Sequence, residues 1–129
     1  MPRLSTFIVE DSPVIRDNLV ATLEELLPLR VVGVAAGEAA ALQWLQRPEH
    51  GAELVIVDIL LQQGSGLGLL RALRSLPRRG RFVVFSNCAS PDLRRQCLAL
   101  GADRVFDKSG EIDELIRYCA ELAAAHAAN

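Results

Sequence analysis

Runs of apolar residues alternate along the chain with stretches in which apolar residues recur every three or four positions. The continuous runs predict strands, which lie at residues 4–9, 31–35, 54–58, 82–86 and 104–107. The periodic stretches predict helices, which begin near residues 12, 38, 69, 90 and 111. Two of these helix starts carry Ser-Pro, a preferred N-cap followed by a preferred first helical residue. The alanine-rich segment 123–129 is expected to fray.

The strict alternation of strands and helices indicates the fold class. Near-continuous apolar strands are typical of a parallel sheet that helices cover on both faces. The sequence therefore predicts an α/β fold, a doubly wound parallel sheet of five strands with five helices. Residues 1–129 are expected to form a single domain, without linker or internal repeat. In such sheets, ligand sites lie beyond the carboxyl ends of the strands.

Charged and hydroxyl residues stand at the carboxyl ends of four predicted strands. Glu10 and Asp11 follow the first strand, Asp58 closes the third, Ser86 closes the fourth, and Lys108 follows the fifth. Three carboxylates at one edge would repel each other, and Mg²⁺, which prefers oxygen ligands, would relieve that repulsion. Lys108 and Ser86 would add a cation and a donor for an anion. The edge is therefore predicted to hold a phosphoryl group beside Mg²⁺, and a carboxylate can itself accept that group.

Each of these residues also has a purely structural interpretation. Asp11 could serve the dipole of the following helix, and Ser86 could cap a turn. Lys108 could pair on the surface with Asp107 or Asp103. Their concentration at the one edge where this fold class places its active sites favours the functional interpretation.

Composition narrows the range of partners. A net charge of −2 and a pI of about 5.7 argue against a broadly basic nucleic-acid surface. No apolar run approaches the roughly 18–20 residues of a membrane span, and the start has no signal-peptide pattern. Cys88, Cys97 and Cys119 lack zinc-site spacing and are predicted to be small apolar residues in a reducing cytoplasm. His50 and His126 show no partner pattern.

Lysine is almost absent from the chain. Of 14 basic residues, 13 are arginine, and Lys108 is the one lysine. Lysine is a compact point charge on a flexible stem, whereas arginine is a wide planar fork. A tight site that needs one small cation would explain the exception, and chance retention of a surface lysine is the alternative.

The chain resembles, over essentially its whole length, the receiver domain of bacterial two-component response regulators. The matching stretches are residues 7–11, 55–58, 83–86 and 101–108. The resemblance implies a flavodoxin-like fold with strand order 2-1-3-4-5. It further implies that Asp58 accepts a phosphoryl group, that Ser86 moves toward this group, and that Lys108 holds one of its oxygens.

The same resemblance implies a set of magnesium ligands. Asp11 and Asp58 would bind Mg²⁺ directly, together with the backbone carbonyl of Leu60. Glu10 would act through a bound water molecule, and it stands where the family more often has aspartate. These assignments rest on the family and not on spacing alone.

Three positions depart from the family pattern. Gln62 stands where the family often has proline, and Ser109 replaces the usual cis-proline after the lysine, which predicts a less rigid loop. The family's switch aromatic is replaced by Val105, and Phe106 is its aromatic neighbour.

Leu60 and Cys88 occupy positions that in the family help to orient the water that hydrolyses the phosphoryl group. Neither side chain is suited to that task, which predicts a long-lived phosphorylated form.

The resemblance implies a receiver and not an enzyme with an external substrate. Because the chain has no room for a second domain, we expect a stand-alone cytoplasmic receiver. The phosphoryl group would come from a histidine kinase or a histidine phosphotransfer protein. The target would be a protein that binds the face formed by the fourth helix, fifth strand and fifth helix, with a homodimer also possible. No nucleic-acid or membrane partner is expected.

Three other functions are alternatives to this one. The first is a receiver-like binding module that works without phosphorylation, although all five site positions are filled. A magnesium-dependent phosphatase would need a general acid where Leu60 stands. A flavin carrier would need a phosphate-binding loop after the first strand, where Glu10 and Asp11 would repel a phosphate without a metal.

Overall fold

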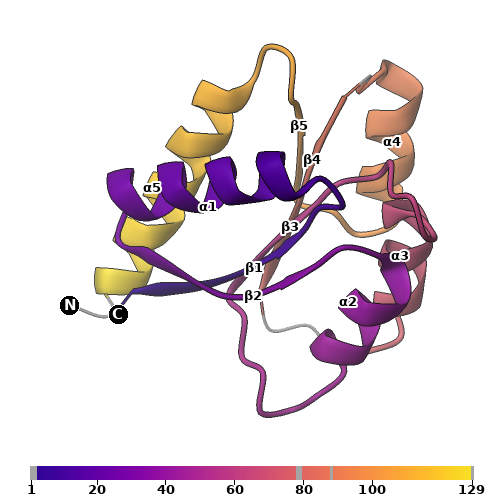
Figure 1. Ribbon diagram of the computed structural model, residues 1–129, viewed down its shortest axis with the longest axis horizontal. Helices are drawn as coiled ribbons and strands as arrows, with labels where there is room; N and C mark the ends of the chain where they lie inside the picture. The colour runs from indigo at the N-terminus through magenta and orange to yellow at the C-terminus, as the bar shows by residue number, and fades with distance from the viewer. Residues whose placement is uncertain (1–2, 78–79, 88, 129) are drawn as a thin grey trace.

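The computed structural model describes residues 3–77, 80–87 and 89–128. Five parallel strands form one sheet in the order β2-β1-β3-β4-β5, which confirms the predicted fold class (Figure 1). The strands are β1 (Leu4–Val9), β2 (Leu29–Ala35), β3 (Leu54–Val57), β4 (Arg81–Ser86) and β5 (Arg104–Asp107). The helices are α1 (Pro13–Leu26), α2 (Glu38–Leu45), α3 (Gly66–Leu73), α4 (Pro91–Ala99) and α5 (Ile112–Ala128).

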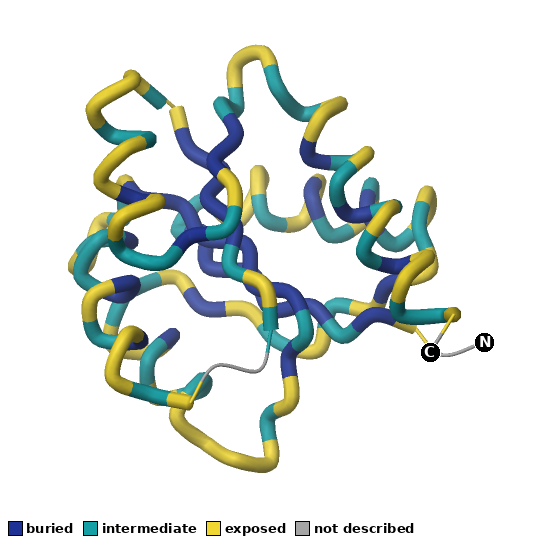
Figure 2. Tube along the Cα trace, turned by 180° about the vertical axis from the view of Figure 1, so that it is seen from behind, coloured by how far each residue is buried: buried dark blue, intermediate teal, exposed yellow. Residues whose placement is uncertain are grey.

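Helices cover both faces of the sheet, as the apolar strands require. Helices α1 and α5 lie on one face, and α2, α3 and α4 lie on the other (Figure 1). Successive residues of β1 alternate between the two sides, so Ile8 packs under α1 and α5, whereas Phe7 and Val9 pack under α2 and α3. The strands form the buried centre of the molecule (Figure 2).

Serine side chains cap three helix starts. The Ser12 and Ser90 hydroxyls accept hydrogen bonds from the Ile15 and Leu93 amides, at 3.3 and 3.2 Å, as the Ser-Pro motifs predict. Ser65 caps α3 in the same way, with 3.0 Å to the Gly68 amide. That cap starts α3 at Gly66, three residues before the start predicted near residue 69.

Two further predicted boundaries are wrong. Strand β2 begins at Leu29, because this fully buried residue pairs with Leu4 at the start of β1. Residues 123–128 do not fray, since α5 continues to Ala128. Ala123 is buried against the sheet, and His126 Nδ1 lies 2.7 Å from the Glu53 carboxylate. Packing and a polar contact hold a helix end that the sequence predicts to be weak.

His50 also has partners that the sequence pattern did not indicate. Its ring stacks on Trp44, with 4.0 Å between centroids, and its Nδ1 lies 2.7 Å from the Trp44 carbonyl oxygen. Trp44 in turn stacks on Phe7 at 4.1 Å. A Cβ at Gly33 of β2 would lie 2.9 Å from the indole ring of Trp44. Glycine at this position therefore leaves the space that the stacked rings occupy.

Cys97 and Cys119 are buried free thiols, which fits their predicted role as small apolar residues. Burial raises the pKa of the Cys119 thiol to about 12. Cys88 lies outside the described residues. Among the described helices, none has the length and apolar character that a membrane span needs.

Candidate functional site

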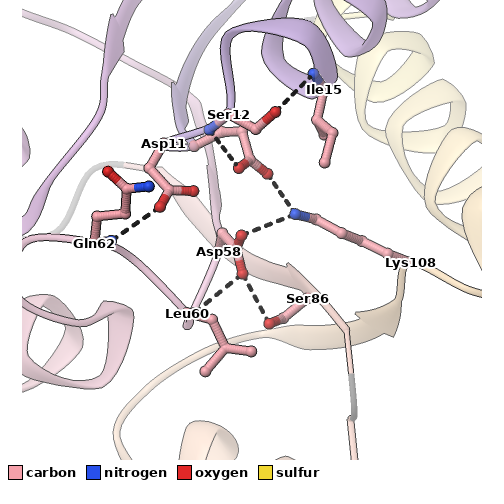
Figure 3. Close-up of polar contacts among 9 residues, drawn as sticks. Asp11, Ser12, Ile15, Asp58, Leu60, Gln62, Ser86 and Lys108 are labelled. Atoms are coloured by element: carbon pink, nitrogen blue, oxygen red, sulfur yellow. Dashed lines mark hydrogen bonds and ion pairs between the residues drawn. The ribbon is translucent and has the colours of Figure 1, made fainter.

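The carboxyl ends of four adjacent strands bring the predicted site residues together. Glu10 and Asp11 directly follow β1, Asp58 directly follows β3, Ser86 ends β4, and Lys108 directly follows β5. Because β1, β3, β4 and β5 are neighbours in the sheet, Asp11, Asp58, Ser86 and Lys108 meet at one edge (Figure 3). Glu10 joins them through its ion pair with Lys108. The strands themselves are held by the buried apolar residues that precede each polar group.

Asp58 is the centre of the site. Its carboxylate is buried, with 6% of the residue exposed. Oδ1 accepts hydrogen bonds from the Ser86 hydroxyl at 2.8 Å and from the Leu60 amide at 3.1 Å. Oδ2 accepts one from the Lys108 ammonium at 2.8 Å. Both carboxylate oxygens therefore face donors that could also serve a group attached to Asp58.

Lys108 bridges two carboxylates instead of pairing on the surface. Its ammonium donates to Glu10 and to Asp58, and its side chain is only 10% exposed. The structure thus excludes the alternative pairing with Asp107 or Asp103. Burial lowers the pKa of Lys108, but the hydrogen bonds to Asp58 and Glu10 outweigh it, so the pKa lies above its usual value. The lysine remains charged at neutral pH.

Glu10 occupies the most desolvated position among these acids. Only 3% of the residue is exposed, and its carboxylate accepts a 3.1 Å hydrogen bond from the Ser12 amide. Burial raises the pKa of Glu10, and the charge of Asp58 adds to that rise, while the hydrogen bond from Lys108 opposes it. A further cation beside these carboxylates would relieve the electrostatic cost.

The acidic residues are close enough to share a metal ion. Glu10, Asp11 and Asp58 each offer an oxygen, and these oxygens lie within 4.8 Å of one another. Asp11 is half-buried, and its Oδ2 accepts a 2.9 Å hydrogen bond from the Gln62 amide. A set of hard oxygen donors is the chemistry that suits Mg²⁺. The donor set therefore fits the predicted ion.

Gln62 gives the site a contact that a proline could not make. Its backbone N–H fixes Asp11 to the loop between β3 and α3, and proline has no N–H. This departure from the family pattern therefore adds a hydrogen bond to a candidate metal ligand.

The loop after Lys108 is closed by side chains. Asp107 Oδ1 accepts a 2.8 Å hydrogen bond from the Ser109 amide, and the Ser109 hydroxyl also donates to it. No cis peptide bond occurs among the described residues. An Asx turn stands where the family has its proline, and the Asp-x-Ser spacing is the sequence signal that could have indicated it.

Sequence reasoning missed a second group of charged residues beside the site. Arg94 of α4 donates to the carbonyls of Ala89 and Val105, at 3.1 and 3.0 Å, and to the Glu111 carboxylate. Glu111 also accepts a 2.8 Å hydrogen bond from the Asp107 amide. The three Arg94 contacts span 5, 11 and 17 positions of the chain, so no single local spacing links these residues.

Val105 and Phe106 face opposite sides of the sheet. Val105 packs in the cluster under α3 and α4, and Phe106 packs in the cluster under α1 and α5. The Phe106 ring lies 5.9 Å from the Tyr118 ring. The aromatic next to the family's switch position therefore points away from α4.

Comparisons with known proteins show what the chain is similar to. The family model described as "Response regulator receiver domain" matches residues 6–120. A probable transcriptional regulatory protein of Picosynechococcus is 38% identical over 120 residues, which cover 89% of this chain and 47% of that protein. The transcriptional regulatory protein CitB of Klebsiella pneumoniae is 28% identical over 83% of this chain and 44% of its own length. The chain thus spans less than half of these curated relatives.

Solved structures show the same fold. The signal receiver domain of the putative response regulator NarL from Mycobacterium tuberculosis has a TM-score of 0.84 at 23% identity, covering 96% of this chain and 98% of that one. The RcsB response regulator of Salmonella typhimurium has a TM-score of 0.82 at 21% identity, covering 97% of this chain and 62% of that one.

Proposed function

This chain belongs to the response regulator receiver domain family, and we propose that it receives a phosphoryl group on Asp58 from a histidine kinase or a histidine phosphotransfer protein. The observation that carries the proposal is the position of one buried carboxylate between Ser86, Lys108 and two further acids. Receiver domains are generally phospho-acceptors and not enzymes with external substrates. The reaction proposed here is accordingly a transfer onto the protein itself.

The transfer requires an exposed path to a carboxylate oxygen and donors for the phosphoryl oxygens. An Asp58 oxygen attacks phosphorus, an O–P bond forms, the P–N bond to the donor imidazole breaks, and the imidazole nitrogen takes up a proton. The Lys108 ammonium and the Ser86 hydroxyl, both 2.8 Å from Asp58, are placed to donate to the transferred group.

Mg²⁺ is the cofactor in this proposal. Asp11, Asp58 and the Leu60 carbonyl would hold the ion directly, and Glu10 would hold it through water. When bound, the ion neutralises charge between these acids and the phosphoryl oxygens. The Leu60 amide already donates to Asp58, so the backbone at this residue lies at the site.

We further propose that residues 1–129 act as a single, stand-alone cytoplasmic receiver that signals by protein contact. The expected target surface is the face formed by α4, β5 and α5. A homodimer through that face or another is the second expected contact, since the similar regulator RcsB has been solved as two dimers bound to two parallel DNAs. No nucleic-acid or membrane contact is assigned to this chain.

Intact-mass measurement after treatment with acetyl phosphate and Mg²⁺ tests the proposal. Wild type should gain one phosphoryl group, and removal of Mg²⁺ with a chelator should prevent the gain. Asp58→Asn should gain none, while Asp17→Asn, at a carboxylate on the exposed side of α1, should behave like wild type. An Asp58→Asn protein that is labelled as fully as wild type overturns the assignment of Asp58 as the acceptor. Wild type that gains no phosphoryl group with Mg²⁺ present favours the phosphorylation-independent binding module.

A further inference from the structure

The two loops that carry the groups on Asp58 are tied to each other by side chains outside the site. Ser86 leads into the loop between β4 and α4, and Lys108 lies in the loop between β5 and α5. The Asp107 carboxylate accepts a 3.2 Å hydrogen bond from the Ala89 amide, which crosses from one loop to the other. The Lys108 amide donates to the Ser86 carbonyl at 3.1 Å. Movement of either loop therefore acts on the other.

Arg94 joins helix α4 to both loops. Its Nε donates to the Ala89 carbonyl, its Nη1 to the Val105 carbonyl and its Nη2 to the Glu111 carboxylate. About a third of each charged side chain is exposed, so the pair is partly shielded from water. Three acceptors on three segments use the planar fork of arginine, which a lysine could not reproduce.

Glu111 carries the connection from Arg94 to Lys108. Its carboxylate accepts from the Asp107 amide at 2.8 Å, and its own amide donates to the Asp107 carbonyl at 2.8 Å. Asp107 then holds Ser109 on the other side of the lysine. The hydrogen bond from Arg94 lowers the pKa of Glu111, and the hydrogen bonds from Ser109 lower that of Asp107, so both acids stay charged at neutral pH.

We infer that Arg94 and Glu111 are positioning residues that hold the backbone on which Lys108 reaches Asp58. The inference rests on the proposed role of Asp58. We call the hydrogen-bonded group of Arg94, Glu111 and Asp107 the clasp. The clasp would supply the rigidity that a proline ring would otherwise give at position 109. A lysine side chain has many rotamers. If the backbone of Lys108 is already fixed, less conformational entropy is lost when its ammonium is held at Asp58. Because Arg94 belongs to α4, the position of that helix and the position of Lys108 are coupled in both directions.

The single lysine of the chain makes a selective test possible. Protein labelled with ¹³C-lysine gives side-chain signals from Lys108 alone, so NMR reports its environment directly. Arg94→Met keeps the aliphatic stem and removes the guanidinium. Arg95→Met is the matched control, because Arg95 is the next residue of α4, is 71% exposed and pairs with Asp92 on the same helix. Glu111→Gln keeps the shape of the side chain and removes its charge.

The first measurement is made without metal or phosphoryl analogue. In Arg94→Met and in Glu111→Gln, the Lys108 signals should shift toward those of a solvated lysine, while Arg95→Met should match wild type. The second measurement is the affinity for beryllofluoride with Mg²⁺, which should fall about tenfold in Arg94→Met, as expected for one charge-assisted hydrogen bond lost. Loss of folding stability alone would leave both readouts unchanged under native conditions.

The outcomes separate this inference from the proposed function. Wild type that neither binds beryllofluoride nor takes up a phosphoryl group contradicts the proposed function, while the Lys108 signals still test the clasp. Unchanged Lys108 signals in both Arg94→Met and Glu111→Gln overturn the clasp, and so does an equal change in Arg95→Met. If Arg94→Met does not fold, Glu111→Gln against Arg95→Met decides the result.

Discussion

The two edges of the sheet each hold a cluster of polar side chains from distant parts of the chain, and the clusters differ in burial. At the carboxyl edge, Glu10 and Asp58 are 3% and 6% exposed. At the amino edge, the Glu53 carboxylate binds the Ser5 amide and hydroxyl and pairs with His126, and its side chain is 38% exposed. Similar groups are therefore desolvated at one edge and hydrated at the other.

This difference separates a chemical role from a structural one. Buried charges cost free energy that their pairing only partly returns, and burial is the main reason why the pKa of Glu10 is raised. The amino-edge cluster ties β1, β3 and α5 together without such a cost. Changes at the carboxyl edge should therefore alter phosphoryl chemistry more than folding, and changes at the amino edge should do the reverse.

Lys108→Arg should give the largest effect, since it keeps the charge and removes the compact ammonium. A guanidinium cannot fit between Glu10 and Asp58 as an ammonium does, and a charge-assisted hydrogen bond is worth about 1.5–3 kcal/mol, or roughly 10- to 150-fold in affinity for beryllofluoride. The expected NMR result is that amide signals of α4 and α5 no longer shift on adding beryllofluoride with Mg²⁺.

The control for this variant is the same exchange reversed at an exposed position, Arg95→Lys, which should respond like wild type. Shifts in Lys108→Arg equal to those of wild type would mean that charge alone suffices. The single lysine would then be an accident of codon usage.

Leu60→Asn should shorten the life of the phosphorylated protein. Leu60 is 60% exposed beside Asp58 and cannot orient water, whereas an amide side chain can. One water-orienting hydrogen bond of about 1 kcal/mol corresponds to roughly fivefold faster hydrolysis. Phosphoryl loss is followed by intact mass after the donor is removed, and slower loss in Leu60→Asn contradicts this account. The second position of that prediction, Cys88, lies outside the described residues.

The sequence predicted most of the carboxyl edge because each site residue stands beside an apolar strand. Glu10, Asp58, Ser86 and Lys108 could be located once the strands were recognised, since parallel strands end at a common edge. The clasp could not be found in this way. Arg94 lies on a helix face, and its partners become visible only when α4 is packed beside β5.

Glu53→Ala should lower the free energy of unfolding by about 1 kcal/mol, because the variant removes the acceptor of two Ser5 hydrogen bonds and the partner of His126. Phosphoryl uptake by the folded protein should match wild type. Denaturant unfolding and intact mass measure the two effects on the same samples. A loss of phosphoryl uptake without a loss of stability would contradict the assignment of a structural role to the amino edge and a chemical role to the carboxyl edge.

The amino edge was poorly predicted from sequence for a related reason. His126 lies in an alanine-rich segment with no periodic signal, and its partner Glu53 is 73 positions away, so nothing local indicates the pair. The contact with Glu53 and the burial of Ala123 are both tertiary, and they override the low expectation for a helix end.

Glu111→Gln should give the smallest effect, on the pH dependence of stability. The pKa of Glu111 in the folded protein is lowered from its ordinary value of 4.5. The charged Glu111 therefore adds to the free energy of unfolding above pH 4.5, and this stabilisation is lost as the pH falls through the folded pKa. With solvent screening, the stabilisation is about 0.5 kcal/mol. The stability difference between wild type and Glu111→Gln should shrink from about pH 6 to about pH 3. A difference that grows on acidification contradicts the sign of the shift.

The most direct test of the central claim locates the phosphoryl group chemically. An aspartyl phosphate is an activated acyl group, and borodeuteride reduces its carboxyl carbon to an alcohol, which leaves a deuterated homoserine at the acceptor position. Wild type treated with acetyl phosphate and Mg²⁺ should show this residue at position 58 by peptide mass spectrometry, and a sample without Mg²⁺ should not. Deuterium at Glu10, at Asp11 or at any other position, or none at all in the sample with Mg²⁺, would contradict the account.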